Sequence, residues 1–242
     1  MPRFYCPQPL VTGSLVDLPE AVAHHLHVVR QQSGAELVLF NGEGGQARAR
    51  LVEIGKRRAT AEVLAMEAVD VELPFRVTLA QGLPEGSKMD WIVEKAVELG
   101  AAAIQPLAAQ RSVVRLAGDR ADKRLAHWQG VVVSASEQCG RNRLADVAPV
   151  QDLNRWLGQG AAGGVCILLS PRADASLAHW TRQAPAQDVT LLVGPEGGFT
   201  DQEEDAALAA GALALSIGPR VLRTETAGLA ALAILAAGWG GI

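Results

Sequence analysis

Hydrophobic residues in the first part of the chain come in short runs that are separated by turn residues. Glu36–Phe40 is a short apolar strand, and Ala47–Ile54 and Ala59–Leu64 are two further expected strands. A glycine-rich cluster at 41–45 and a polar turn at 55–58 divide them, as is typical of β-strands joined by tight turns. One helix interrupts the strands, from Pro19 to about Arg30, with proline in its first turn. The pattern predicts a small β-barrel over residues 1–72.

The pattern changes near residue 73, where apolar strands begin to alternate with helices. The expected strands are Val77–Gln81, Ala103–Pro106, Val165–Leu169, Val189–Val193 and Ala212–Ile217. The expected helices are Lys88–Leu99, Arg120–Gln138, Thr200–Gly211 and Thr224–Gly238. Two of them, Val165–Leu169 and Val189–Val193, are continuous apolar runs bounded by polar turns, which is typical of a parallel sheet buried on both faces. The sequence therefore predicts an α/β domain over residues 73–242.

Local signals mark two of the helix ends. Thr200 followed by Glu203 has the spacing of a capping box, in which each side chain satisfies a backbone amide of the other residue. Gly100 closes the helix that begins at Lys88, because glycine readily adopts the left-handed conformation that ends many helices.

The last expected helix is apolar around its whole circumference. Between Ala227 and Ala237 every residue is Ala, Gly, Leu or Ile. A helix without a polar side is buried on all sides. Either the fold encloses this helix, or a second subunit covers it, and the second interpretation predicts a homodimer.

The composition indicates a folded chain with a substantial core. Of the 242 residues, 49% are hydrophobic and 20% are charged, which argues against a disordered protein. The three cysteines are far apart, so we expect neither a disulfide framework nor a zinc site. The chain begins without a signal-peptide pattern, and its longest apolar run is shorter than the ~20 residues of a membrane span. We therefore expect a soluble, cytoplasmic protein.

The net charge of −4 conceals two basic islands. Between Arg111 and Arg143, seven basic residues stand against three acidic ones. Between Arg48 and Arg58, five basic residues stand against one acidic residue. Such islands are typical of phosphate-binding surfaces, but solvated faces of an ordinary protein look the same, and charge alone favours neither interpretation.

Two loops near the C-terminus are the strongest candidates for a binding site. Gly194–Phe199 directly follows a buried strand, and Ile217–Ala227 joins the next strand to the last helix. Ligands of open α/β sheets bind at such carboxyl ends of strands. Neither loop has the G-x-G-x-x-G or G-x-x-x-x-G-K-[ST] pattern of common nucleotide sites. Taken singly, the first loop is an ordinary turn and the second a helix start capped by Thr224; together they favour a shared pocket.

Together these loops resemble a known family. Leu192–Thr200 and Leu215–Ala227 are similar to the paired C-terminal loops of the ribosomal RNA small subunit methyltransferase E family. The resemblance extends over nearly the whole chain, because further segments are similar as well. These segments are His25–Arg30, Glu94–Gly100, Gln110–Ser112 and Ser136–Arg141. The paired loops are its most specific part.

This resemblance implies a fold and an activity. The fold would be a SPOUT-type α/β domain with a C-terminal trefoil knot, an exception to unknotted topology, preceded by a PUA-like β-barrel that helps to hold RNA. The activity would be S-adenosylmethionine-dependent methylation of N3 of a specific uridine in 16S ribosomal RNA. The partners would be that RNA or the assembled small ribosomal subunit, and a second copy of the chain bound through the knotted domain.

The resemblance also suggests roles for individual residues. Those expected to hold S-adenosylmethionine are Leu169, Val193, Gly194, Pro195, Gly198, Ile217, Gly218, Val221, Leu222, Thr226 and Ala227. Arg223 is expected to stabilise the negative charge on uracil, with Glu196 and Glu225 as alternative bases. The expected RNA contacts are Arg30, Arg111, Arg115 and Arg141.

Other interpretations stay open at this point. The chain could methylate a different RNA, bind RNA without catalysis, or act on a small molecule. We expect no metal, because His24, His25 and His27 on one helix do not converge on a single ion. The tryptophans are expected mostly to pack in the core rather than to stack on bases; they are Trp91, Trp128, Trp156, Trp180 and Trp239.

Overall fold

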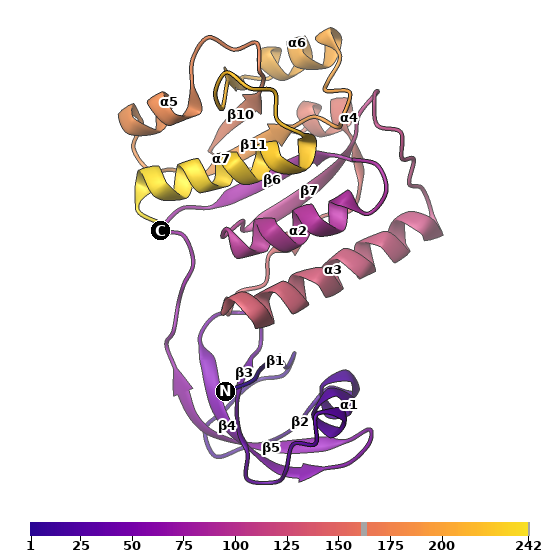
Figure 1. The fold of residues 1–242 in the computed structure, drawn as a ribbon, viewed down its shortest axis with the longest axis vertical. Helices are drawn as coiled ribbons and strands as arrows, with labels where there is room; N and C mark the ends of the chain where they lie inside the picture. Colours follow the sequence, from indigo (N-terminus) through magenta and orange to yellow (C-terminus); the bar gives the residue numbers. More distant parts are fainter. Residues whose placement is uncertain (161–163, 242) are drawn as a thin grey trace. The chain divides into compact units, whose positions relative to one another are not determined.

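The structure is a computed structural model that describes residues 1–160 and 164–241. It divides into two compact units (Figure 1). The N-terminal unit comprises Met1–Glu72 and Ser136–Leu144, and the C-terminal unit comprises Leu73–Ala135 and Ala145–Ile242. The segment 136–144, which the hydrophobic pattern places in the second domain, thus groups with the first.

The N-terminal unit is built on one sheet with the strand order β1-β3-β4-β5-β2. Its strands are β1 (Arg3–Tyr5), β2 (Leu15–Asp17), β3 (Glu36–Phe40), β4 (Gln46–Ile54) and β5 (Ala59–Glu67). The three long strands confirm the sequence-based expectation, and β4 and β5 form an antiparallel hairpin. Helix α1 (Glu20–Val28) buries Val22, Ala23 and Leu26 against this sheet and begins directly after Pro19.

The segment 136–144 is bound into this unit by buried polar contacts. The Glu137 carboxylate accepts a hydrogen bond from the Tyr5 amide at 2.9 Å, and Arg3 donates to Asn142 Oδ1 at 2.8 Å. Arg141 is 3% exposed, and its guanidinium is paired with the Glu72 carboxylate. Burial raises the pKa of Glu137, against the opposing effect of the Tyr5 amide. These contacts make the C-terminal end of helix α3 (Asp119–Cys139) part of the N-terminal unit.

The C-terminal unit contains a parallel sheet with the order β12-β10-β11-β6-β7-β8, and β9 pairs with β7 beyond β8. Its strands are β6 (Val77–Gly82), β7 (Ala103–Ala108), β8 (Asp146–Val147), β9 (Gln151–Asp152), β10 (Val165–Leu169), β11 (Val189–Val193) and β12 (Leu213–Leu215). This arrangement confirms the predicted α/β class and the two apolar central strands.

Helices cover both faces of this sheet (Figure 1). On one face α7 (Thr224–Trp239) packs on β6 and β11, between α2 (Lys88–Glu98) and α5 (Leu177–Gln183). On the other face α4 (Leu153–Gly158) and α6 (Asp201–Ala209) bury Trp156 and Ala207 in a cluster with Leu168 and Leu192 of the strands. The Trp128 indole donates to Asp90 at 3.0 Å and thereby links α3 to α2.

The strand order brings the C-terminal segments together. Along the chain, β6 is followed by β7, β8 and β9, which all lie on one side of β6 in the sheet. The chain then crosses to β10 on the opposite side of β6, and β11 lies between β10 and β6. Because β10, β11 and β12 are parallel neighbours, the loops that follow them lie at the same edge of the sheet. The trefoil threading of the last segment stays a prediction.

The expected helix ends agree with the structure. Thr200 and Glu203 form the capping box at the start of α6. Gly100 and Gly211 follow α2 and α6 with φ of 88° and 92°, the left-handed conformation that suits glycine. The suggested cap at Thr224 was wrong: α7 begins at Thr224 itself, and the N-cap position is Arg223, whose side chain makes no capping bond.

Candidate functional site

A cavity of about 510 Å³ lies where the loops after β10, β11 and β12 meet. The lining residues belong to the C-terminal unit: Lys88, 169–171, 193–198, Ile217, Gly218, 220–225 and Ala227. The two loops selected from the sequence thus form one site, together with the loop after β10 and the first residue of α2. A volume of this size is typical of small-molecule pockets.

Thr224 connects the two main loops. Its hydroxyl donates to the carbonyl oxygen of Gly194 at 2.6 Å and accepts from Gln81 Nε2 at 2.9 Å. Thr224 is 6% exposed, and Gln81 of β6 is fully buried. A buried hydrogen bond of this kind is costly to break, because it leaves polar groups without partners. The Thr224 hydroxyl therefore fixes the start of α7 directly to the loop after β11, and Gln81 of β6 holds that hydroxyl in place.

Glycine is required at the tightest positions of the loop after β11. A Cβ atom on Gly194 would lie 3.0 Å from the backbone of Gly198 and Phe199. A Cβ on Gly82, at the end of β6, would lie 2.7 Å from Pro195 Cδ. Gly198 has φ of 68°, which disfavours a side chain. These close contacts shape the loop so that its backbone lines the cavity.

Arg111 supports the same loop from outside the cavity. Its Nη1 atom donates to the carbonyl oxygen of Gly197 at 2.9 Å and to that of Phe199 at 3.0 Å. A Cβ on Gly197 would approach the Arg111 side chain to 3.3 Å, so the absence of a side chain allows close packing. Arg111 was expected to contact RNA; in the structure its guanidinium holds the loop that lines the cavity.

Lys88 and Glu196 form an ion pair at the cavity wall. The Lys88 ammonium donates to Glu196 Oε1, which also accepts from the Glu85 amide at 3.0 Å. Burial opposes ionisation of Glu196, but these hydrogen bonds outweigh it and lower the pKa of Glu196 below its ordinary value. The hydrogen bond to Glu196 also raises the pKa of Lys88. The lowered pKa favours the ionised form of the Glu196 carboxylate.

Glu225, in the first turn of α7, has a different environment. Its Oε2 atom is buried and makes no hydrogen bond to any residue that the structure describes. The neighbouring Arg223 is exposed and lines the cavity. A carboxylate oxygen without a partner beside a cavity is suited to accept a proton or a hydrogen bond from a ligand.

The structure places almost all of the expected cofactor residues on this cavity. Thr226 is the exception, because it lines a neighbouring cavity together with Trp91. Arg223, Glu196 and Glu225 also lie on the cavity wall. Sequence reasoning missed Lys88, Ser170, Pro171, Gly197, Arg220 and Thr224. Gly197 and Thr224 stand inside the selected loops, but nothing local in the sequence marks Lys88 or Ser170.

The expected RNA contacts are distributed over both units. Arg30 is exposed, follows α1, and has an unusual φ of 57°. Arg115 is exposed, and its guanidinium donates to the carbonyl oxygens of Ala109 and Gln110 at 3.1 Å. Arg141 differs, since its guanidinium is buried against Glu72 within the N-terminal unit and presents no free charged surface there.

The cavity suits a ligand with an apolar ring and a polar edge. Leu169, Val193, Ile217 and Leu222 supply apolar walls, and the glycine loops offer backbone groups. Within residues 1–160 and 164–241 no cluster of three or more His, Cys, Asp or Glu is arranged to hold a metal. In the same residues no helix combines the length and apolar character needed to cross a membrane.

Comparison with known families agrees with both units. Residues 71–236 match the family model described as RNA methyltransferase domain. Residues 18–64 match the model described as RNA methyltransferase PUA domain. The first match covers more than half of the chain, and the two together span both units.

Individual relatives are similar over nearly their full length. The chain is 41% identical to a ribosomal RNA small subunit methyltransferase E from Neisseria gonorrhoeae bound to S-adenosyl methionine, with a TM-score of 0.92, covering 99% of this chain and 98% of that one. A putative methyltransferase from Legionella pneumophila, in complex with the same cofactor, has 33% identity and a TM-score of 0.91 over 97% and 96% of the two chains. The ribosomal RNA small subunit methyltransferase E of Bacillus subtilis is 32% identical over 89% of this chain and 87% of its own length.

Proposed function

Because the chain belongs to the ribosomal RNA small subunit methyltransferase E family, we propose that it transfers a methyl group from S-adenosylmethionine to N3 of one uridine in 16S ribosomal RNA. The observation that carries this proposal is the cavity that the loops after β10, β11 and β12 form together. Two relatives whose structures contain the cofactor share this fold over almost the whole chain.

The cavity residues are suited to hold the cofactor. Leu169, Val193, Ile217 and Leu222 would pack on adenine, and the backbone of Gly194–Gly198 and Gly218 would bind polar edges of the ligand. Of the remaining expected residues, Pro195 and Val221 lie in the same loops, and Ala227 lines the cavity from the first turn of α7, whereas Thr226 faces the neighbouring cavity. When bound, S-adenosylmethionine supplies an electrophilic methyl group on a sulfonium.

The three charged candidates take different roles. Arg223 stabilises the negative charge that develops on the uracil oxygens when N3 loses its proton. Glu225 is the better base, because its buried oxygen makes no hydrogen bond within the described chain. Glu196 is the weaker acceptor, since its bond to Lys88 lowers its pKa. Glu196 instead holds Lys88 and the start of α2 against the loop.

RNA binding is assigned to both units. The PUA domain match and the exposed Arg30 support RNA contacts by the N-terminal unit. In the C-terminal unit, Arg111 contacts the loop that lines the cavity, through the carbonyl oxygen of Gly197. Arg115 contacts Gln110, the residue next to Arg111, so both arginines are near this loop. Arg141 takes no part in RNA binding in this proposal, because pairing with Glu72 buries its charge. The substrate would be the RNA or the small subunit, in the cytoplasm.

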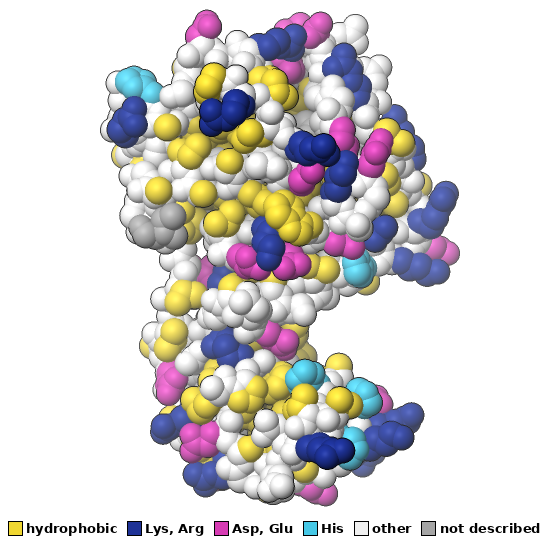
Figure 2. Space-filling model, viewed as in Figure 1, with side chains coloured by type: hydrophobic (Ala, Val, Ile, Leu, Met, Phe, Trp, Pro, Cys, Tyr) yellow, Lys and Arg dark blue, Asp and Glu magenta, His cyan; other side chains and the backbone are white. Residues whose placement is uncertain are grey.

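A second copy of the chain is expected to cover α7. One side of this helix is packed in the fold through Leu229, Leu232 and Leu235. The other side is incompletely covered and presents only small or apolar residues: Ala230, Ala233, Ile234 and Ala237. Figure 2 shows apolar side chains over α7 on the face turned to the viewer. Association through this side would give the homodimer.

Cofactor titration and methyl transfer together test the function. Calorimetry should detect S-adenosylmethionine binding, and tritium from its methyl group should enter small ribosomal subunits or their RNA from a strain that lacks this methylation. Binding without transfer to any RNA would favour a non-catalytic RNA-binding protein. Transfer to a different RNA would redirect the proposal within the same class, and no cofactor binding would contradict it.

A further inference from the structure

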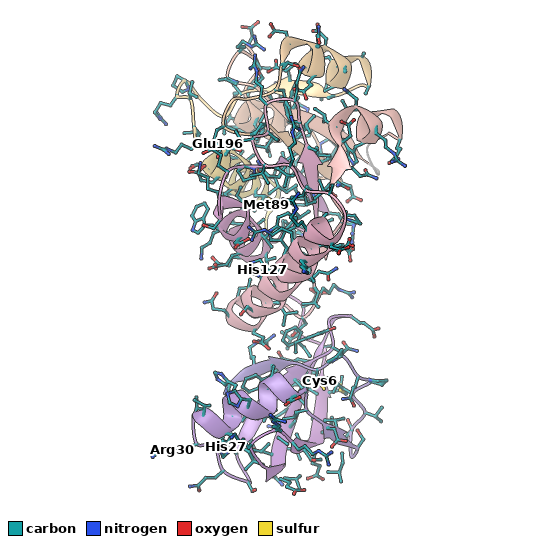
Figure 3. The ribbon with its side chains drawn as sticks, turned by 90° about the vertical axis from the view of Figure 1, so that its right-hand side faces the viewer. Cys6, His27, Arg30, Met89, His127 and Glu196 are labelled. Atoms are coloured by element: carbon teal, nitrogen blue, oxygen red, sulfur yellow. The ribbon has the colours of Figure 1, made fainter. Side chains whose placement is uncertain are left out.

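A second cavity of about 430 Å³ lies beside the first, between the beginnings of α2 and α7. Its lining residues are Ser87, Lys88, Trp91, Glu225 and Thr226. Lys88 and Glu225 also line the larger cavity, so the two spaces meet at these side chains. Figure 1 shows α2 and α7 side by side, and Figure 3 shows Glu196 close to the first turn of α2, which Met89 marks. We call this space the Trp91 cavity.

Trp91 is unusual among the tryptophans of this chain. Trp128 is 2% exposed and Trp156 is 7% exposed, as expected for core residues, whereas Trp91 is 45% exposed. Its indole ring forms a wall of the cavity from the first turn of α2. An exposed aromatic face beside a pocket is a platform on which a nucleic-acid base can stack.

The polar groups of this cavity have a definite pattern. Lys88 offers an ammonium donor, and Ser87 and Thr226 offer hydroxyl groups. Glu225 offers an acceptor, and its Oε2 atom is buried without a partner among the described residues. The charges of Lys88 and Glu225 interact, because Glu225 contributes to the raised pKa of Lys88. The cavity therefore combines donors with one carboxylate acceptor beside an aromatic wall.

This pattern matches the reactive edge of uracil. Uracil presents an N3–H donor between two carbonyl oxygens, so a carboxylate flanked by donors pairs with all three atoms. Cytosine presents a lone pair at N3 and an amino donor at C4, so it would set a lone pair against the carboxylate. A site whose polar groups are left unpaired by the wrong base discriminates strongly against it.

We propose that the Trp91 cavity holds the target uracil, stacked on Trp91, with Glu225 at N3–H and Lys88 at a carbonyl oxygen. This inference rests on the proposed function and adds the place of the base and the residues that select it. The N3 proton passes to Glu225. The freed electron pair on N3 bonds to the methyl carbon, while the bond from that carbon to sulfur breaks and its electrons remain on sulfur. Glu225 then releases the proton to solvent.

The test compares Trp91→Ala, Trp91→Phe and Glu225→Gln with a matched control, Leu208→Ala. Leu208 is also 45% exposed but lies on α6, away from this cavity. The substrates are a small-subunit RNA fragment that the wild type methylates and the same fragment with the target uridine changed to cytidine. Three quantities are measured: kcat/KM, the cofactor Kd by calorimetry, and quenching of tryptophan fluorescence by the RNA with S-adenosylhomocysteine bound.

We expect Trp91→Ala to lower kcat/KM by on the order of tenfold or more, mainly through KM, as lost stacking predicts. Trp91→Phe should restore most of the activity but remove the quenching. Glu225→Gln should lower kcat and reduce the preference of RNA binding for uridine over cytidine. The cofactor Kd should change less than about twofold in both Trp91 variants, and Leu208→Ala should behave as wild type.

Two results would overturn this inference. One is a Trp91→Ala variant with wild-type KM and unchanged quenching. The other is a Trp91→Ala variant that dissociates into monomers in sedimentation and loses activity only for that reason, since Trp91 would then be a subunit contact. Either result leaves wild-type methyl transfer intact, so the proposed function would survive. Absence of transfer by the wild type would instead contradict the proposed function.

Discussion

The hydroxyl of Thr224 donates to the carbonyl oxygen of Gly194 at 2.6 Å, across 30 positions of the sequence. This bond joins the beginning of α7 to the loop after β11, and Gln81 completes it from β6. A cavity wall made from two loops keeps its shape only if the loops are fixed to each other. The contact therefore links the packing of the sheet to the site that we assign to S-adenosylmethionine.

Thr224→Val should weaken cofactor binding. The change keeps the size of the side chain but removes its hydroxyl, so Gln81 Nε2 loses one acceptor and Gly194 loses its donor. Leaving buried polar groups unpaired costs about 1–3 kcal/mol, and loss of that amount from the bound state would raise Kd roughly five- to 150-fold. Calorimetric titration with S-adenosylmethionine measures this effect. Thr224→Ser, which keeps the hydroxyl, should bind almost as the wild type does; equal affinities of the Val and Ser variants would contradict the role.

Arg111→Ala separates loop support from RNA contact. If Arg111 supports the loop through Gly197 and Phe199, its removal should raise the cofactor Kd by roughly three- to tenfold, in the absence of any RNA. Arg120→Ala, at an exposed position in the first turn of α3, serves as the matched loss of one positive charge. A Kd that Arg111→Ala leaves unchanged, together with weaker RNA binding, would show that Arg111 acts on RNA alone.

Lys88→Met should make stability depend less on pH in the acidic range. The bond to Lys88 lowers the pKa of Glu196. The pair therefore stabilises the fold at pH values above the ordinary carboxyl pKa, and this stabilisation is lost as the pH falls through the lowered pKa of Glu196. Urea unfolding should therefore show wild type to be more stable than Lys88→Met at pH 7, with the difference shrinking below about pH 4. Because the pair is partly exposed, the difference should be small. Lys123→Met, at an exposed lysine of α3, should show no such trend.

Arg223→Ala should lower turnover far more than cofactor affinity. Arg223 is exposed on the cavity wall and is assigned to the charge that develops on uracil. Removing one such group typically lowers kcat by about 100-fold or more. Single-turnover methyl transfer and calorimetry measure the two effects separately, with Arg182→Ala on α5 as the control. Near-normal turnover would remove Arg223 from the catalytic set.

Much of the α/β domain could be predicted from hydrophobic pattern. Val165–Leu169 and Val189–Val193 were predicted with the observed bounds, because they are almost wholly apolar and end at glycine or polar residues. Helices α4 and α5 were missed, since they are too short to show a helical period. Their N-cap residues, Asp152 and Ser176, were the available signals, and both side chains cap the helix.

The sequence identified the parts of the candidate site that lie within the two selected loops, but not the residues that other elements contribute. Glycines and prolines identified the loops after β11 and β12, because these residues mark backbone that lies close to a ligand or to another loop. Lys88 could not be found in this way, since its place at the cavity depends on how α2 packs against α7. Arg141 was misjudged for a similar reason: its partner Glu72 lies 69 positions away, so the sequence does not show that its charge is buried.

Mapping the methylated nucleotide tests the central claim most directly. Small subunits from a strain that lacks this methylation are treated with the protein and S-adenosylmethionine, and the nucleosides of the 16S RNA are analysed by mass spectrometry with site mapping. We predict 3-methyluridine at one position, formed by the wild type and strongly reduced with Arg223→Ala. Methylation of a ribose, of another base, or of many scattered uridines would contradict this account.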